Sequence, residues 1–309
     1  MHRSRPGDRD RLREGLTRRA ALRAPGGRLI DSPRDLCEKA GVKRPAVRYA
    51  LAFLITIASA IYQRLSGPTY PVRGHVVLGG KEIRYKLTRT HGGAGDQPVV
   101  VTVPDPAVTG TVAWRRFPTN DDWQFLPMPR KGDALEAALP HQPPAGKLEY
   151  QVRLTTGAET VLAPPRPAIT RFKGDVSTPV LITHVAVMFT GMLVSTAAGL
   201  AALVPGLPLR RRSLIALGLI LLGGFVLGPL VQKEAFGEYW TGIPFGWDLT
   251  DNKTLFAALF WAAAVFLQRK GEDRRGAVLA AALATLVVFA IPHSVWGSEL
   301  RWETGAKPG

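Results

Sequence analysis

The sequence contains a single cysteine, Cys37, among its 309 residues. One cysteine excludes an intrachain disulfide, and it equally excludes a zinc site of the Cys₄ or Cys₂His₂ type. Any exported part of the chain must therefore be stabilised by its hydrophobic core alone. We expect Cys37 to be a small buried residue in a short helix that begins at Ser32 and Pro33.

The sequence also lacks the short motifs of common catalytic and nucleotide-binding sites. It holds no GxSxG, P-loop or HExxH pattern, and no glycine-rich dinucleotide fingerprint between a strand and a helix. His75, His91 and His141 have no second metal ligand at a fixed spacing. No catalytic residue is assigned, and a non-catalytic protein is favoured over an enzyme.

Acidic residues are scarce beside basic ones, with 24 Asp and Glu against 40 Lys and Arg and a net charge of +16. Such an excess suits nucleic-acid binding, but no recognition motif accompanies it. The arginines instead precede the first apolar segment or occupy short turns between later ones, at 210–212 and 269–275. Cytoplasmic segments of membrane proteins have this distribution, so we expect contact with a lipid bilayer and none with nucleic acid.

The first 45 residues are expected to form a basic, cytoplasmic segment. Its composition is compatible both with a helix bound to anionic lipid and with a solvated tail. A transmembrane helix is predicted over 46–66, where Arg48 and Arg64 bound an apolar run and can extend their charges to the interface. A cleaved signal peptide is disfavoured. The apolar run begins far from Met1, and no small-residue cleavage site follows it.

Residues 67–175 lose the helical period and read as short strands separated by Pro, Gly and Asp. A hairpin is expected around Gly79 and Gly80. Strands at this spacing predict an antiparallel β-sandwich, outside the cytoplasm. The segment 148–152, Leu-Glu-Tyr-Gln-Val, resembles the tyrosine-corner strand of immunoglobulin-like and fibronectin-type domains. The resemblance implies that the Tyr150 hydroxyl forms a hydrogen bond back to the chain. Domains of this type mostly bind other molecules or act as spacers, and few are catalytic.

Residues 176–297 form a transmembrane domain of four further helices, predicted at 178–203, 213–231, 254–268 and 276–295. Small residues spaced by four let helix backbones approach closely and are expected at helix contacts. They are Gly191 and Ser195 in the first of these helices, and Gly224 and Gly228 in the second.

The fold class is therefore a membrane α-helical protein with five transmembrane helices. An all-β, immunoglobulin-like sandwich is inserted between helix 1 and helix 2. All three basic segments fall on the cytoplasmic side only if the chain crosses the membrane five times. The sandwich and the tail 298–309 are then extracytoplasmic.

The loop 232–253 between the third and fourth helices is unusually aromatic, with Tyr239, Trp240 and Trp247 among glycines. This composition suits an interfacial belt or a re-entrant segment at headgroup depth, and it is a candidate interaction surface. Thr250 or Asp251 is expected to cap the fourth helix. Asp248, Asp251 and Lys253 are expected to form an ion-pair network that locks the loop.

Three segments resemble a family of uncharacterised bacterial multi-pass inner-membrane proteins. They are 228–233 (GPLVQK), 239–254 (YWTGIPFGWDLTDNKT) and 291–294 (IPHS). The resemblance covers about the last 130 residues and implies a bacterial inner membrane. It implies no activity, and it carries over no functional residues.

A candidate cofactor site involves two histidines. His184 lies six residues after Thr178, about 9 Å along the helix, and Met188 follows one turn later. The five-helix topology puts His293 at the same, outer side. Two such histidines are the minimum for a haem b, and His with Met can hold haem or copper. Alternatively, His184 bonds a loop carbonyl or Asp248 and His293 caps its helix.

Two functions follow. The first is a non-catalytic accessory subunit of a larger bacterial membrane complex, respiratory or photosynthetic, whose helices and sandwich contact other subunits or an extracytoplasmic protein. The alternative is electron transfer through haem b or a metal at His184 and His293. A transporter is disfavoured because nothing resembles an inverted repeat and few charges lie inside the predicted helices.

Overall fold

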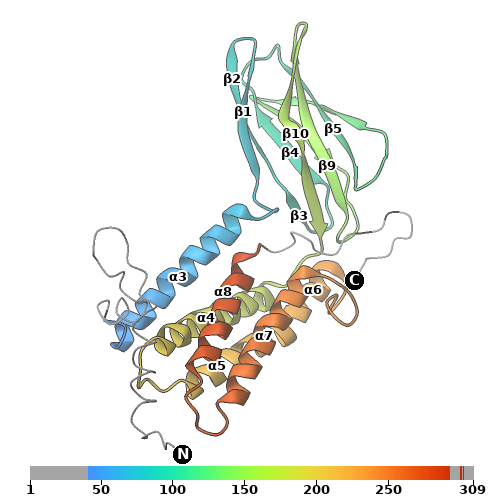
Figure 1. The fold of residues 1–309 in the computed structure, drawn as a ribbon. Helices are drawn as coiled ribbons and strands as arrows, with labels where there is room; N and C mark the ends of the chain where they lie inside the picture. Colours follow the sequence, from blue (N-terminus) through green and yellow to red (C-terminus); the bar gives the residue numbers. More distant parts are fainter. Residues whose placement is uncertain (1–40, 293–299, 301, 303–309) are drawn as a thin grey trace, which may run out of the picture.

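The computed structural model describes residues 41–292, Leu300 and Trp302. The expectations for the basic N-terminal segment and for Cys37 lie outside these residues. The described chain has two parts: a β domain stands at one end of a bundle of helices (Figure 1). We call this end of the bundle the outer end.

Prolines mark the start of several helices, since proline lacks the amide hydrogen that a first turn leaves unused. Pro45 and Pro179 lie in the first turns of the helices before and after the β domain. The helices are α3 (Pro45–Ser66), α4 (Thr178–Ala202), α5 (Arg210–Leu221), α6 (Gly228–Phe236), α7 (Leu249–Leu267) and α8 (Arg275–Ala290), with a π-helix η1 (Leu222–Leu227) joining α5 to α6.

Three helical segments of the described chain are long and apolar enough to cross a membrane: Pro45–Ser66, Thr178–Ala202 and the continuous run Arg210–Phe236. By length and composition, three of the five predicted transmembrane helices therefore meet this criterion. The other two predicted helices form, but α8 has only 16 residues. The first turns of α7 contain polar residues, including Asp251, Asn252 and Lys253, so its apolar part is shorter than the whole helix.

Helix α4 contacts α3, α5 and α8, and the contacts depend on small side chains. A Cβ at Gly199 would lie 2.6 Å from the Cβ of Ala282 in α8, so glycine is needed for this approach. The largest buried side chain of the bundle is Trp261 in α7, whose Nε1 donates to Thr285 Oγ1 of α8 at 2.9 Å. The bundle core therefore consists mainly of alanines around one tryptophan.

Arginines hold the helix ends that lie away from the β domain. The guanidinium of Arg275 donates to four carbonyls at the end of α4 and in the turn after it: Ala201, Ala202, Val204 and Leu207. Arg210 donates to the Gln268 carbonyl just after α7, at 2.7 Å. Helix C-termini leave carbonyls without partners, and cations there are favourable.

The β domain contains ten strands within the described residues. A five-stranded sheet has the order β3-β10-β9-β5-β6, a three-stranded sheet the order β4-β8-β7, and β1 and β2 pair with each other. The strands are β1 (Val72–Leu78), β2 (Lys81–Leu87), β3 (Thr90–Gly92), β4 (Gln97–Thr102), β5 (Thr109–Phe117), β6 (Gln124–Met128), β7 (Arg130–Lys131), β8 (Ala134–Leu139), β9 (Lys147–Thr156) and β10 (Glu159–Lys173).

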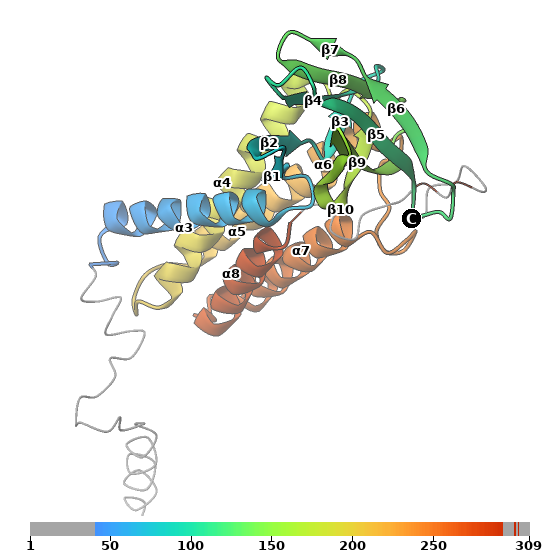
Figure 2. The ribbon, with the colours of Figure 1, turned by 90° about the horizontal axis from the view of Figure 1, so that it is seen from above.

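The hairpin predicted around Gly79 and Gly80 is confirmed. Both glycines have positive φ, 56° and 74°, as a two-residue turn between right-twisted strands requires. Figure 2 shows the three-stranded sheet and this hairpin lying over one face of the five-stranded sheet. The domain is thus a two-layered sandwich.

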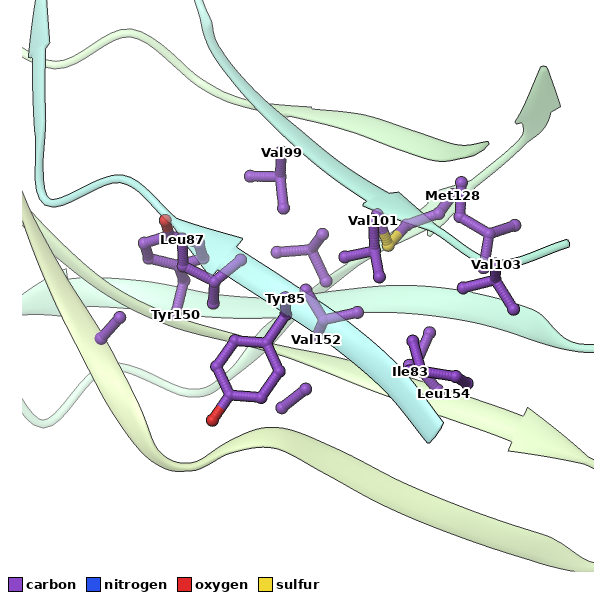
Figure 3. Packing of buried hydrophobic residues seen from close by; sticks show 14 of the residues in the cluster. Ile83, Tyr85, Leu87, Val99, Val101, Val103, Met128, Tyr150, Val152 and Leu154 are labelled. Atoms are coloured by element: carbon purple, nitrogen blue, oxygen red, sulfur yellow. The ribbon is translucent and has the colours of Figure 1, made fainter. Parts of the chain in front are cut away.

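The sandwich core is built from alternate residues of its strands, because successive side chains of a strand point to opposite faces. Figure 3 shows Ile83, Tyr85 and Leu87 of β2 packed with residues of β4 and β9. The Tyr150 hydroxyl donates to the Thr88 carbonyl at 2.7 Å, so the predicted bond back to the chain is confirmed. Its acceptor, however, lies 62 residues upstream, and burial raises the pKa of Tyr150.

The β domain is fixed to the bundle at the outer end. The Gly174 amide donates to the Ala235 carbonyl of α6 at 2.8 Å. Ser177, which precedes α4, donates from its amide to Glu234 Oε2 at 2.7 Å. Beyond α8, Trp302 Nε1 donates to the Phe117 carbonyl of the β domain at 3.1 Å. The sandwich thus contacts the third helical segment and the C-terminal part of the chain.

Replacing Arg275 by glutamine removes most of the bonds to the turn after α4, and we expect a loss of about 1–3 kcal/mol. The thermal midpoint of the detergent-purified protein should fall by several degrees. Arg274→Gln is the matched control, since Arg274 is exposed and pairs with Glu272. Equal midpoints for the two variants would contradict the capping role of Arg275.

Candidate functional site

The aromatic loop, residues 237–248, joins α6 to α7 at the outer end of the bundle. Helix α6 ends at Gly237, whose φ of 82° allows its amide to donate to the Lys233 carbonyl at 2.8 Å. The loop then returns along the start of α7. Its backbone amides find acceptors there, as buried backbone amides require.

Two side chains in the first turn of α7 supply these acceptors. Asp251 Oδ2 accepts from the Thr241 amide at 2.6 Å, from Thr241 Oγ1 at 3.1 Å and from Gln232 Nε2 at 3.2 Å. Asn252 Oδ1 accepts from the Ile243 amide at 2.7 Å. Asp251, Asn252 and Thr241 are all buried. The loop is therefore held by acceptors that water reaches poorly.

Gly242 and Trp240 allow the loop to pack closely against α7 and η1. A Cβ at Gly242 would lie 2.7 Å from the Cβ of Asp251 and 2.8 Å from Asn252 Oδ1, so any larger residue would push the loop away. The Trp240 ring stacks on Phe225 of the π-helix at a centroid distance of 5.2 Å, and its Nε1 donates to the Ile243 carbonyl. The loop is thus packed on both α7 and η1.

Helix α7 begins earlier than predicted, and its cap is a different residue. Asp248 Oδ1 accepts from the amides of Thr250 at 2.7 Å and Asp251 at 3.4 Å. The expectation that Thr250 or Asp251 caps the helix is therefore wrong, and the helix begins at Leu249. An aspartate just before the first turn is a strong cap, and it adds favourable charge at the helix N-terminus.

Lys253 donates its hydrogen bond to a carbonyl, and the Asp248 carboxylate interacts with its charge at longer range. Its buried ammonium donates to the Ile291 carbonyl, just after α8, at 2.7 Å. Gln63 of α3 donates to the same carbonyl at 3.3 Å and to that of Phe289 at 2.8 Å. Within the described chain Lys253 and Asp251 form no ion pair, because residues two apart on a helix face different directions. The predicted ion-pair network therefore does not join Lys253 to Asp251.

The remaining aromatic side chains of the loop point outward. Phe245 and Trp247 are 78% and 80% exposed, and Tyr239 is 55% exposed with its ring 5.0 Å from Lys233 Nζ. Exposed aromatics on a rigid frame are typical of protein and membrane-interface contacts.

His184 lies beside the π-helix. Its Nδ1 donates to the Gly223 carbonyl at 3.0 Å, and a Cβ at Gly223 would lie 2.4 Å from Met188 Sδ. His184 and Met188 therefore share one face of α4, against η1. His293 lies outside the described residues, and the haem site stays a prediction. Within the described residues, no three His, Cys, Asp or Glu side chains lie close enough to hold a metal.

The predicted small-residue faces contact several neighbours. A Cβ at Gly191 would lie 3.3 Å from Leu219 of α5. Gly224 faces α7, where an added Cβ would be 2.3 Å from Thr254, whereas Gly228 faces His184 of α4. These two glycines therefore contact different helices, because the π-helix changes the angle between residues four apart. Ser195 is buried in α4.

Sequence reasoning did not assign the loop anchors Gln232, Thr241 and Asn252 to the site. Polar residues at the start of an apolar helix were the available indication, since buried polar groups are costly unless hydrogen-bonded. Their partners lie nine to nineteen residues away, so no local pattern pairs them.

No protein-family model and no curated protein matches the chain. Among solved structures, the crystal structure of chicken CNTN1 FN1–FN3 domains is similar to it at 11% identity and a TM-score of 0.20. The match covers 30% of this chain and 38% of that one. Similarity at this level carries no argument about what the β domain binds.

Replacing Asp251 by alanine leaves the buried Thr241 amide without its acceptor, at a cost of about 1–3 kcal/mol. We expect chymotrypsin to cleave the loop near Phe245 and Trp247 at least several-fold faster in detergent. Glu238→Ala, which removes one negative charge from the same loop, should cleave like the unmodified protein. If both variants were cleaved alike, Asp251 would not be the anchor.

Proposed function

We propose that the chain crosses a bacterial inner membrane five times and is a non-catalytic subunit of a larger membrane complex. In this proposal the β domain and the aromatic loop are extracytoplasmic and contact other proteins. One observation carries the topology. Trp302, beyond α8, donates to Phe117 of the β domain, which supports an even number of crossings between the β domain and the tail.

The two shorter helices are compatible with crossing. At 1.5 Å per residue, the apolar part of α7 (254–267) and the whole of α8 are about 21 and 24 Å long, somewhat shorter than a hydrocarbon core of about 30 Å. Packing in a bundle and local thinning of the bilayer accommodate such a mismatch. Lys253 lies at the outer end of α7, where its ammonium has the Ile291 carbonyl as a partner.

The arginines support the orientation. Arg210, Arg211, Arg212, Arg274 and Arg275 all lie in or beside the two turns at the far end of the bundle from the β domain. Short loops rich in arginine are retained in the cytoplasm. The β domain at the other end is then exported.

The contact role rests on the aromatic loop. Its exposed side chains, Tyr239, Phe245 and Trp247, stand on a frame fixed by Asp251 and Asn252. Tryptophan and tyrosine are enriched at the centres of protein interfaces, and a rigid loop loses little entropy on binding. The β domain is also fixed, through Gly174 and Ser177, so both surfaces have a constant relative position.

The topology is tested by reporter fusions. Alkaline phosphatase fused after Gly309 should be active, because the C-terminus is extracytoplasmic, whereas phosphatase inserted at Gly271 should be inactive. Green fluorescent protein at the same positions should give the reverse pattern. A fluorescent fusion at Gly309 would contradict five crossings.

The contact role is tested by photo-crosslinking in native membranes. A benzoylphenylalanine at position 247 should give a protein adduct of discrete mass. The same residue at position 62, where Tyr62 of α3 is 59% exposed, serves as a lipid-facing control and should give none. No protein adduct at 247, or equal adducts at both positions, would count against a subunit role.

A further inference from the structure

The strand β10 is interrupted by prolines. Its register with β9 shifts between Ala163 and Ala168, where residues 164–167 read Pro-Pro-Arg-Pro. Proline has no amide to donate, so it occurs in sheets at edges and irregularities. An open pocket of about 500 Å³ lies at this interruption. It is lined by these four residues together with Val72, Arg89, Ala168 and Ile169.

Arg89 is the polar group of this pocket. Its Nε donates to the Ile169 carbonyl over a long 3.4 Å, and the side chain is partly buried. Burial lowers the pKa of Arg89, which reflects the cost of removing the charge from water. Within the described chain neither Arg89 nor Arg166, on the pocket wall, forms an ion pair. A guanidinium has five N–H donors, so most of those on Arg89 remain for a ligand.

Other arginines of the β domain are differently placed. Arg115 pairs with Glu149, and Arg116 with Asp121. Arg130 donates to three carbonyls, those of Val103, Asp105 and Val108. The guanidinium groups of these three arginines therefore donate to partners within the β domain. Arg89 differs because it lines a pocket and its guanidinium makes a single long hydrogen bond among the described residues.

The pocket lies near the membrane end of the β domain. Val72 begins β1 six residues after Ser66, the end of α3, and six residues span at most about 20 Å. Two more arginines, Arg64 and Arg73, flank the Tyr70 ring at 5.6 and 5.7 Å in this connection. Two further positive charges therefore lie at the connection that leads from α3 to this pocket.

We propose that this pocket binds a phosphate group through two residues that line it, the half-buried Arg89 and the exposed Arg166. The planar guanidinium matches two phosphate oxygens, and the proline walls keep the site rigid and apolar around it. The phosphate belongs either to an anionic phospholipid headgroup or to a soluble phosphate ester. The lipid source rests on the proposed topology, whereas the phosphate site does not.

The test uses the full chain in nanodiscs and in detergent. Native mass spectrometry counts bound phosphatidylglycerol, and thermal midpoints are measured with glycerol phosphate against chloride at equal ionic strength. Arg89→Gln should reduce lipid occupancy or phosphate stabilisation at least five-fold. The control Arg153→Gln removes an exposed charge from β9, beside the Phe125 ring, and should stay within two-fold of the unmodified protein.

The outcomes separate the two sources. An Arg89-dependent effect with phosphatidylglycerol alone identifies a lipid headgroup, and one with glycerol phosphate identifies a soluble ester. If Arg89→Gln fails to fold, the exposed Arg166→Gln should still reduce binding about three-fold. Binding of neither probe, or an equal loss in Arg89→Gln and Arg153→Gln, would overturn the proposal. A cytoplasmic C-terminus with intact Arg89-dependent binding would overturn the topology alone.

Discussion

The hydrogen bonds from the aromatic loop to Asp251 and Asn252 are the interaction on which the outer end of the molecule depends. Buried backbone amides need acceptors, and each amide that lacks one costs several kcal/mol in an apolar medium. Because the acceptors belong to the first turn of α7, the loop and that helix form one unit. Helix α6, where the loop begins, bonds in turn to Gly174 and Ser177. The position of the β domain follows from these contacts.

The two ends of the bundle use opposite chemistry. At the outer end, carboxylate oxygens of Asp248 and Asp251 accept from backbone amides around the N-terminus of α7. At the other end, the guanidinium groups of Arg210 and Arg275 donate to carbonyls at the C-termini of α7 and α4. This arrangement suits the helix dipole at both ends. The arginines that indicate orientation in the sequence therefore also cap helices.

Patterns of local origin were predictable from the sequence, and long-range pairings were not. The helices, the Gly79-Gly80 hairpin and most strands follow from periodicity and turn residues. The sequence of β8, Ala134–Leu139, has no strand pattern because it consists of helix-favouring residues, and its pairing with β4 determines its conformation. The π-helix was missed because η1 has no distinct composition. Its effect is to turn Gly224 and Gly228 toward different helices.

The aromatic loop explains why a distinctive sequence need not identify a function. Trp240 and Gly242 serve packing, because one stacks on Phe225 and the other allows close approach to α7. Trp247 and Phe245 have no comparable burial. The sequence cannot separate these roles, since all are aromatic or glycine residues within one short segment. Phe245, Trp247 and Tyr239 are the aromatic side chains of the loop that the fold leaves exposed, and they are therefore available to a partner.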